Sequence, residues 1–449
     1  MKTYLQKYVS AAPLSLFRIV FGLMIFISIV RFWSKGWIHE LYIEPKYFFS
    51  FYGFDFVKPI GEYTYFIFVI CAISALMVAA GLFYRVAAIC LFVSFTFIEL
   101  MDKSTYLNHY YFVSMVCFLL IFIPAHAYFS FDSYRNKRAN ADKVPKWSID
   151  ALKLFICLVY VFAGLAKVNS DWLLEALPLK IWLPAKNDMP LVGTLFNHVW
   201  VAYAFCWMGC LYDLTIPFML LGKSTRIFAY TAVVVFHLMT ALLFPIGMFP
   251  FIMIAAALIF FSADFHESII RTIGSWFNVS GEFLQPKRNF QFSTLSTNCI
   301  VAVLALFFFV QTITPFRYLA YPGELFWTEE GYRFSWRVML IEKAGYAQFT
   351  LKDEAGRQVV VDNREFLTPL QEKMMSTQPD MILQYAHMLR DHYSAEGLRN
   401  PKVFVDSYVG LNGRLGKPLV DPSTDLAVQR DSFAHKPWIL TYSDEIKGL

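Results

Sequence analysis

Lys167 is the residue whose type and place in this sequence most directly suggest chemistry. It ends the apolar stretch Tyr160–Lys167 (YVFAGLAK), after which the chain returns to polar residues. A lysine at such an edge commonly extends its charged end to the membrane surface. In the alternative interpretation the amine is withdrawn from water, which disfavours the ammonium form and leaves a neutral nitrogen able to accept a proton. That nitrogen would be a general base.

Asn108 and His109 form a second polar group, at the start of another apolar stretch. A single histidine in such a place is more often a hydrogen-bonded core residue than a functional one. The membrane topology derived from the cationic loops, however, brings Asn108, His109 and Lys167 to the same depth. Three polar side chains at one level favour a site.

The segment Phe244–Pro250 (FPIGMFP) interrupts the apolar sequence with two prolines and a glycine. A break in a membrane helix is tolerated where it reaches the interface or lines a cavity. The segment is therefore either a tight outer turn or a flat apolar slot for a planar ring. The walls of that slot would be Phe244, Met248 and Phe249.

His237, Asp213, Cys206 and Cys210 also lie within apolar stretches. We expect His237 to be structural, and Asp213 to pair with a cation or a polar helix neighbour because a buried acid needs a partner. Cys206 and Cys210 are one helical turn apart, but their apolar neighbours indicate packing rather than half of a metal site. No metal site is predicted.

The composition indicates what kind of scaffold must position these residues. Of 449 residues, 57% are hydrophobic, 18% aromatic and only 16% charged, whereas a soluble protein is about 25% charged. Disorder, a collagen-like fibre and a small disulfide scaffold are excluded by the 47 Phe residues, the aperiodic glycines and the seven cysteines. The net charge of +5 is not gathered into basic blocks, so nothing indicates nucleic-acid binding. The chain is predicted to be an integral membrane protein.

The apolar runs predict a polytopic α-helical membrane protein with eight or nine transmembrane helices, since a helix needs about 20 apolar residues to span a bilayer. The runs lie near residues 13–33, 63–83, 85–100, 109–129, 150–167, 199–221, 225–244, 248–263 and 297–315. The third and eighth are short, which leaves eight as the alternative count. Cationic residues favour cytoplasmic loops, and the loop near residues 130–149 is rich in them. This puts the N-terminus in the cytoplasm, the spans in the cell (inner) membrane and the C-terminal part outside.

A rise in charge density after Pro315 marks the predicted domain boundary. Residues 316–449 carry 34 of the chain's 73 Asp, Glu, Lys and Arg residues. We therefore expect a transmembrane helical domain over residues 1–315 and an extracytoplasmic, strand-rich α+β domain over residues 316–449. The elements predicted in the outer domain are a hairpin at 346–362, helices at 369–375 and 380–393, and strands at 402–409 and 414–420.

Several segments together resemble the vitamin K-dependent γ-glutamyl carboxylases. Tyr160–Trp172, with the pattern aromatic-x-x-Ala-Gly-x-x-Lys-x-x-x-Asp-Trp, is similar to the segment that holds their catalytic lysine. Asp102–His109 and Phe244–Phe249 resemble two more of their membrane motifs, while Gly331–Trp336 and Asn412–Arg414 resemble motifs of their tail. The order is kept from about residue 10 to residue 440. Bacterial members of the family share the membrane module, which is described as a horizontally transferred transmembrane domain.

The resemblance implies a membrane enzyme that uses O2, CO2 and a reduced quinone of the vitamin K or menaquinol type. In that reaction a base deprotonates the hydroquinone, and oxygenation yields an epoxide and a stronger base. This base removes a γ-proton from a protein glutamate, which then adds CO2. The matching motifs imply that Lys167 is the hydroquinone base, that Asn108 and His109 support it, and that Tyr332 and Trp336 lie near the glutamate.

The implied partners are a glutamate-containing polypeptide, the quinone and membrane lipid. Two alternatives stay open: a quinone epoxidase or monooxygenase without peptide carboxylation, and a non-enzymatic protein that binds a quinone or lipid. The sequence also departs from the family at two places. Ala166 precedes Lys167 where a second lysine is frequent, and Pro245 stands where the animal enzymes have serine.

Overall fold

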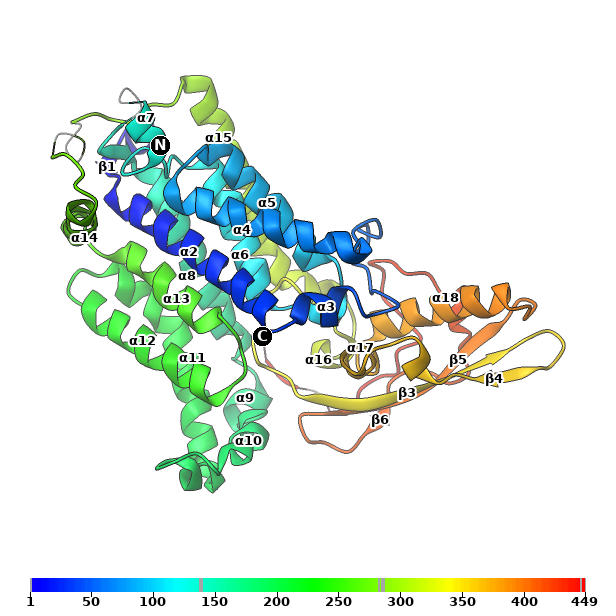
Figure 1. The fold of residues 1–449 in the computed structure, drawn as a ribbon. Coiled ribbons are helices and arrows are strands. Elements are labelled where there is room, and N and C mark those ends of the chain that lie inside the picture. Colours follow the sequence, from blue (N-terminus) through cyan, green and yellow to red (C-terminus); the bar gives the residue numbers. More distant parts are fainter. Residues whose placement is uncertain (1, 137–139, 282, 284–286, 445, 449) are drawn as a thin grey trace.

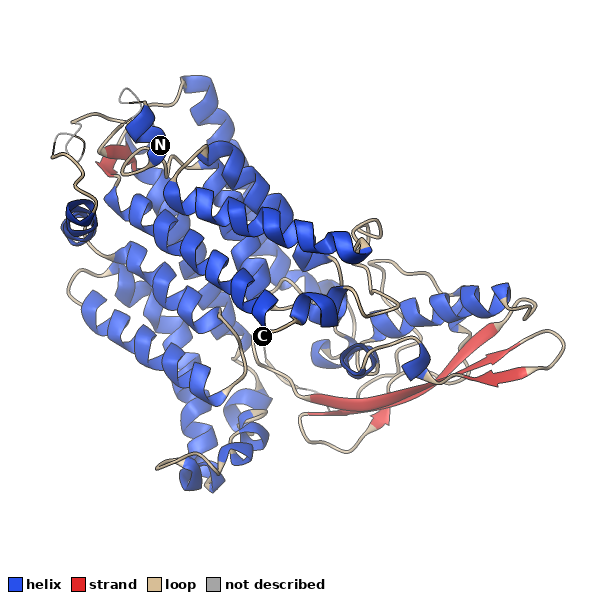
Figure 2. Cartoon of the chain, viewed as in Figure 1, coloured by secondary structure: helices blue, strands red, loops and turns tan. Residues whose placement is uncertain are grey.

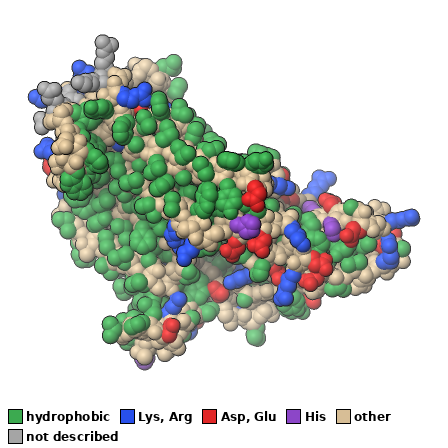
Figure 3. Space-filling view, viewed as in Figure 1, with side chains coloured by type: hydrophobic (Ala, Val, Ile, Leu, Met, Phe, Trp, Pro, Cys, Tyr) green, Lys and Arg blue, Asp and Glu red, His purple; other side chains and the backbone are tan. Residues whose placement is uncertain are grey.

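The computed structural model describes residues 2–136, 140–281, 283, 287–444 and 446–448. It consists of a bundle of long helices and, projecting from one end of the bundle, a C-terminal domain that holds most of the strands (Figures 1 and 2). Figure 3 shows hydrophobic side chains over the visible side of the bundle and charged side chains gathered on the C-terminal domain. This distribution is typical of a membrane-embedded bundle attached to a water-exposed domain.

Each of the nine predicted apolar runs contains a helix. The helices are α2 (Ala12–Ser34), α4 (Thr64–Ala80), α5 (Tyr84–Leu100), α6 (Asn108–Phe122), α8 (Lys146–Ala166), α11 (Val199–Leu221), α12 (Arg226–Leu243), α13 (Phe249–Ala257) and α15 (Thr294–Ile313). By length and composition, six helices among the described residues can cross a membrane. A seventh span results if the segments Phe249–Phe260 and Ala263–Trp276, which are bent by 113°, count as one. The polytopic helical fold class is confirmed. A total of eight spans requires at least one of α5 and α6, which have 17 and 15 residues, and a total of nine requires both of them and the bent pair.

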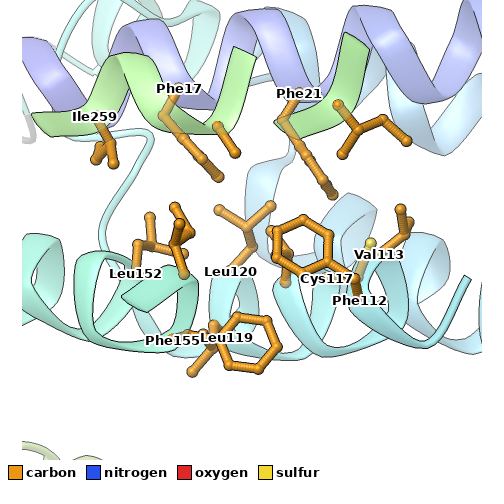
Figure 4. Packing of buried hydrophobic residues seen from close by; sticks show 14 of the residues in the cluster. Phe17, Phe21, Phe112, Val113, Cys117, Leu119, Leu120, Leu152, Phe155 and Ile259 are labelled. Atoms are coloured by element: carbon orange, nitrogen blue, oxygen red, sulfur yellow. The ribbon is translucent and has the colours of Figure 1, made fainter. Parts of the chain in front are cut away.

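The core of the bundle lies between α2, α6 and α8. Phe17 and Phe21 of α2 point toward Leu120 of α6 (Figure 4). Phe112 of α6 stacks on Phe155 of α8, with ring centroids 5.5 Å apart. In a membrane, close packing of this kind rather than removal from water holds helices together. It fixes α8, the helix whose far end carries Lys167.

The C-terminal domain is built on an antiparallel sheet with the strand order β4-β3-β5-β6. Its strands are β3 (Lys343–Lys352), β4 (Gln358–Val360), β5 (Lys402–Leu411) and β6 (Lys417–Pro418). Helices α17 (Pro369–Met375) and α18 (Pro379–Ala395) pack against this sheet. The predicted hairpin, the first predicted strand after it and both predicted helices are confirmed.

The predicted strand over residues 414–420 is too long. Only Lys417–Pro418 pairs with the sheet, opposite Tyr408 and Val409. Leu419 still donates a 3.1 Å backbone hydrogen bond to the Ser407 carbonyl of β5, but the paired strand does not continue beyond Pro418. Val420 forms an isolated bridge with Ile439 instead.

Buried polar contacts fix the C-terminal domain on the bundle. Asp171, shortly after α8, accepts hydrogen bonds of 2.6 and 2.8 Å from the Arg414 guanidinium and one of 2.7 Å from the Asn412 amide. In the loop between α5 and α6, Lys103 forms a 2.8 Å ion pair with Asp380. Bidentate arginine–carboxylate pairs define orientation as well as distance. The motif Asn412–Arg414 therefore orients the domain on the membrane helices.

Candidate active site

Helices α8, α11, α12 and α13 enclose a cavity of about 320 Å³, which we name the apolar chamber. Figure 1 shows α11, α12 and α13 side by side on one flank of the bundle. The walls of the apolar chamber are mainly aromatic and aliphatic, and they include Phe205, Met208, Phe236, Met239, Phe244 and Met253. A cavity of this size and character suits a small organic ring system rather than a polypeptide.

Lys167 and Asp213 form an ion pair in the wall of the apolar chamber. The Lys167 amine lies 2.7 Å from a carboxylate oxygen of Asp213 and donates a second bond of 3.2 Å to the carbonyl of Ala163. Both charged side chains are only 8% exposed. The amine also lies 5.4 Å from the ring centroid of Trp172, a distance at which an aromatic face stabilises a cation. The expected partner of Asp213 is thus confirmed to be a cation, namely Lys167.

Gly164 is what allows α8 and α11 to approach closely enough for this pair. A β-carbon at position 164 would lie 2.8 Å from the side chain of Leu214 and 3.0 Å from its backbone nitrogen. Contacts that short with backbone force neighbouring atoms apart. Because Leu214 follows Asp213 directly, any larger residue at 164 would push the carboxylate away from Lys167.

A second cavity, of about 490 Å³, lies between the membrane helices and the C-terminal domain, and we name it the polar chamber. Its wall contains four cationic side chains and one carboxylate. These are Arg31, Lys103, Arg333 and Arg337, with Glu329. The excess of positive charge favours an anionic occupant.

The carboxylate of Asp380 holds two of these cations in place. It lies 2.7 Å from the Arg333 guanidinium and 2.8 Å from the Lys103 amine. Burial alone would raise the pKa of Asp380, but the charges and hydrogen bonds of Arg333 and Lys103 outweigh it and hold that pKa well below its usual range. The carboxylate is therefore ionised at neutral pH, and the two cations are fixed at the chamber wall.

The two chambers share a wall that comes from the loop between α12 and α13, from the first residue of α13 and from the C-terminal domain. Phe249 stands in its middle, with its ring centroid 5.7 Å from that of His109 on one side and 5.8 Å from that of His237 on the other. The residues that line both chambers are Ile246, Phe249, Val338 and Met339. Two ligands placed in the two chambers would therefore be separated by single side chains.

The structure distributes the predicted site residues over both chambers. Lys167 and Phe244 line the apolar chamber, Asn108, His109, Met248 and Tyr332 line the polar chamber, and Phe249 lines both. Asn108 and His109 therefore face a different chamber from Lys167. The predicted slot at 244–250 is the segment that makes part of this wall.

Trp336 lines neither chamber. Its ring packs between Tyr111 and Phe155 in the bundle core, at centroid distances of 4.9 and 5.6 Å. Its place among buried aromatic rings indicates that it anchors the chain segment around it.

The segment Phe334–Met339, which we name the strap, forms the part of the shared wall that comes from the C-terminal domain. Three of its residues that are not glycine have positive φ, namely Phe334 (61°), Trp336 (59°) and Met339 (56°). Each such conformation costs about 1–3 kcal/mol and persists only where surrounding contacts enforce it. The strap is therefore held in a strained form beside both chambers.

Asn108 is one of the groups that hold the strap. Its side-chain amide donates a 2.9 Å hydrogen bond to the carbonyl of Arg337. Its side-chain oxygen accepts a 3.1 Å bond from the Tyr106 hydroxyl, which in turn accepts a 2.8 Å bond from the backbone N–H of Phe334. Asn108 thus positions the wall.

Sequence reasoning missed two features of the apolar chamber. It did not join Lys167 to Asp213, although two buried ionisable residues of opposite charge are each other's simplest partners. It also treated His237 as structural, whereas His237 lines the chamber and lies 3.0 Å from the Tyr160 hydroxyl. Tyr160 and His237 are 77 positions apart in the sequence, which is why sequence reasoning did not find this second contact.

Comparison with known families places the chain in a class of membrane proteins. The HTTM domain family matches residues 6–265, which is more than half of the chain. The lumenal domain of vitamin K-dependent gamma-carboxylase matches residues 296–445. The chain therefore belongs to the HTTM family and, with both domains in this order, to the vitamin K-dependent carboxylases. No solved structure matches the chain.

Proposed function

We propose that this protein is a γ-glutamyl carboxylase that uses a reduced naphthoquinone, O2 and CO2 and couples glutamate carboxylation to quinone epoxidation. The observation that carries the proposal is the buried Lys167–Asp213 pair in an apolar chamber that adjoins a cationic one. An apolar ring and an anionic side chain need opposite surroundings. Two chambers with one thin wall supply both.

The residues of the apolar chamber fit a reduced naphthoquinone. Aromatic and methionine side chains face the cavity, and polar groups are confined to a few places on its wall. Flat apolar walls suit a fused ring, and the few polar groups suit its two oxygens. When bound, the hydroquinone supplies, with O2, the strong base that γ-proton removal requires.

The Lys167–Asp213 pair would accept the proton of a hydroquinone hydroxyl. The pair is neutral overall whether its proton is on the amine or shared with the carboxylate, so it has room for one more proton. Acceptance leaves a net positive charge in a cavity of low polarity. Trp172, whose ring lies 5.4 Å from the amine, stabilises that charge.

The polar chamber would bind the glutamate side chain of a polypeptide. Arg337 and Arg31 supply positive charge in its wall, and Tyr332 and His109 supply hydrogen-bonding groups. Guanidinium groups bind carboxylates with defined geometry. A glutamate held there would face Phe249 and, beyond it, the apolar chamber.

The proposed location is the cell (inner) membrane, with the N-terminus in the cytoplasm and the C-terminal domain outside. The apolar helices and the match to a lumenal domain support a membrane protein with an extracytoplasmic C-terminal region. In this arrangement the quinone would enter from lipid, and the polypeptide would enter from water.

The proposal is tested with detergent-solubilised protein, reduced vitamin K or menaquinol, a glutamate-containing peptide and labelled bicarbonate. Epoxide together with labelled peptide is the expected result. Epoxide without labelled peptide would favour a quinone monooxygenase. Quinone binding without either product would favour a non-enzymatic quinone- or lipid-binding protein, and both outcomes contradict the proposed carboxylase.

A further inference from the structure

Tyr160 and His237 form a second polar pair in the apolar chamber. The Tyr160 hydroxyl lies 3.0 Å from Nε2 of His237, and both residues line the cavity. His237 is 3% exposed, and its Nδ1 has no hydrogen-bond partner among the described residues. A buried polar atom without a partner is costly, and in native proteins it calls for an explanation.

Tyr160 comes earlier in α8 than Lys167, so the two polar pairs meet the chamber at different levels of that helix. Tyr160 and Lys167 are both on the α8 side of the cavity and are seven residues apart, which corresponds to two turns and about 10 Å along the axis. A ring with an oxygen on each side, plus a hydrogen bond of about 2.8 Å at each oxygen, spans a length of that order. The backbone spacing of Tyr160 and Lys167 is therefore of the length that one such ring and its two hydrogen bonds would span.

Besides the pair, the neighbouring polar groups are the Thr240 hydroxyl and the Tyr212 hydroxyl, which is buried and has no hydrogen-bond partner among the described residues. Phe236 and Met253 supply apolar wall of the chamber. The Thr240 hydroxyl, which also lines the chamber, donates a 2.9 Å bond to the backbone carbonyl of His237. A ring oxygen at the level of the pair would therefore meet the Tyr160–His237 pair or the Tyr212 hydroxyl.

The pair can serve either oxidation state of a ring oxygen. If Tyr160 donates to Nε2, its oxygen is free to accept a bond from a hydroquinone hydroxyl. If Nε2 carries the proton and donates to Tyr160, the tyrosine hydroxyl is free to donate to a carbonyl oxygen. A change of histidine tautomer thus adapts the same two side chains to substrate and to product.

We propose that Tyr160 and His237 bind the quinone oxygen remote from Lys167 and thereby fix which ring oxygen faces the Lys167–Asp213 pair. This inference rests on the proposed function, because it assumes that the apolar chamber takes the quinone. It gives His237 a binding role in place of the structural one expected from sequence.

The test is a binding cycle on the full chain in detergent, without turnover and without O2. The probes are 2-methylnaphthalene-1,4-diol and the two mono-ols that each lack one of its ring oxygens. Wild-type protein is expected to bind the diol about tenfold more tightly than each mono-ol, because tenfold corresponds to about 1.4 kcal/mol, which lies within the cost of about 1–3 kcal/mol for a buried partner left unsatisfied. In Tyr160→Phe, the preference for the diol over one mono-ol should fall to less than about threefold, and the preference over the other should remain.

Two further variants serve as a control and as an independent check of the pair. Tyr84→Phe also removes a buried hydroxyl, which donates a 2.7 Å bond to the Leu120 carbonyl, but it lies outside both chambers and should leave both preferences unchanged. His237→Leu should reproduce the selective loss seen in Tyr160→Phe. If Tyr160→Phe keeps both tenfold preferences, the role of the pair is refuted while the quinone site stands. If wild-type protein binds none of the probes, the quinone site itself is refuted, and the role of the pair with it.

Discussion

The apolar and polar chambers share a wall but differ in the balance of cationic and anionic side chains that line them. In the apolar chamber the buried amine of Lys167 is matched by one carboxylate 2.7 Å away. In the polar chamber several cations face one carboxylate, and Asp380 behind the wall fixes two of them. The first arrangement keeps a proton acceptor among apolar groups, and the second attracts an anion. Under the proposed function, proton abstraction and carboxylate binding would therefore be separated by the thickness of a side chain.

The contrast between the two chambers is tested most strongly by removing the Asp213 carboxylate, which balances the charge of Lys167 in the apolar chamber. Asp213→Asn leaves the Lys167 amine without an ionic partner, and breaking one side of a buried pair costs about 3–5 kcal/mol. We expect a lower Tm and epoxide formation reduced at least about 100-fold, because a misplaced general base forfeits most of its contribution. Asp264→Asn, at an exposed position of α14 (Ala263–Trp276), should leave both unchanged. Epoxide formation by Asp213→Asn at the wild-type rate would show that the pair has no part in proton transfer.

In the polar chamber the matching change is Asp380→Asn, with a pH-dependent effect on stability. A carboxyl group whose pKa is lowered by folding stabilises the protein above its unfolded pKa of about 4 and loses that contribution as the pH falls. Asp380→Asn should therefore destabilise the protein at pH 7 by about 2 kcal/mol, the scale of a charged hydrogen bond. Thermal unfolding of the two proteins between pH 7 and pH 3 should show the difference in Tm shrinking below about pH 4. A difference that stays constant over this range would contradict the ion-pair account.

Opening the shared wall should uncouple quinone epoxidation from glutamate carboxylation. Phe249→Ala removes the ring between His109 and His237 and would admit water to the apolar chamber. We expect the ratio of epoxide to carboxylated peptide to rise about tenfold, equivalent to about 1.4 kcal/mol of lost coupling. The control is Phe251→Ala in the same helix, because Phe251 is 43% exposed and lines neither chamber. An unchanged product ratio in Phe249→Ala would mean that this side chain does not separate the two steps.

The smallest expected effect comes from loosening the strap. Asn108→Ala removes the hydrogen bond to the Arg337 carbonyl, a contribution of about 1 kcal/mol. The KM for the glutamate-containing peptide should rise about fivefold while Kd for the quinone changes less than twofold, since the bond lies on the polar side. Asn108→Asp keeps the oxygen that accepts from Tyr106 but loses the donor, and it should behave like Asn108→Ala. A larger effect on quinone binding than on peptide binding would place Asn108 with the apolar chamber instead.

Much of the scaffold was predictable because it depends on local patterns. The apolar runs, the hairpin that leads into β4 and the amphipathic face of α18 follow from hydropathy and periodicity along short segments. Lys167 stood out for the same reason, as a charged residue at the end of a long apolar run. The predicted strand over 414–420 was wrong in extent because only Lys417–Pro418 pairs with β5, whereas Val420 pairs with Ile439 from a distant part of the chain.

The division into two chambers was not predictable from the sequence. The predicted topology puts residues 108, 109 and 167 at one membrane level, but which cavity each faces depends on the rotation of α6 and α8 and on the strap, which comes from the C-terminal domain. The partnership of Lys167 with Asp213 depends on Gly164, where the close approach of α11 involves residues about 50 positions away. Such contacts arise from tertiary packing and leave no periodic signal.

The central claim is that the Lys167–Asp213 pair accepts the quinone proton in the apolar chamber. The most direct measurement is epoxide formation from reduced vitamin K by Lys167→Ala, with and without an added small primary amine, beside Lys153→Ala as a control in the same helix. We predict a loss of at least about 1000-fold, partial recovery with the amine, and normal activity in the control. Epoxide formation by Lys167→Ala at the wild-type rate without added amine would contradict the claim.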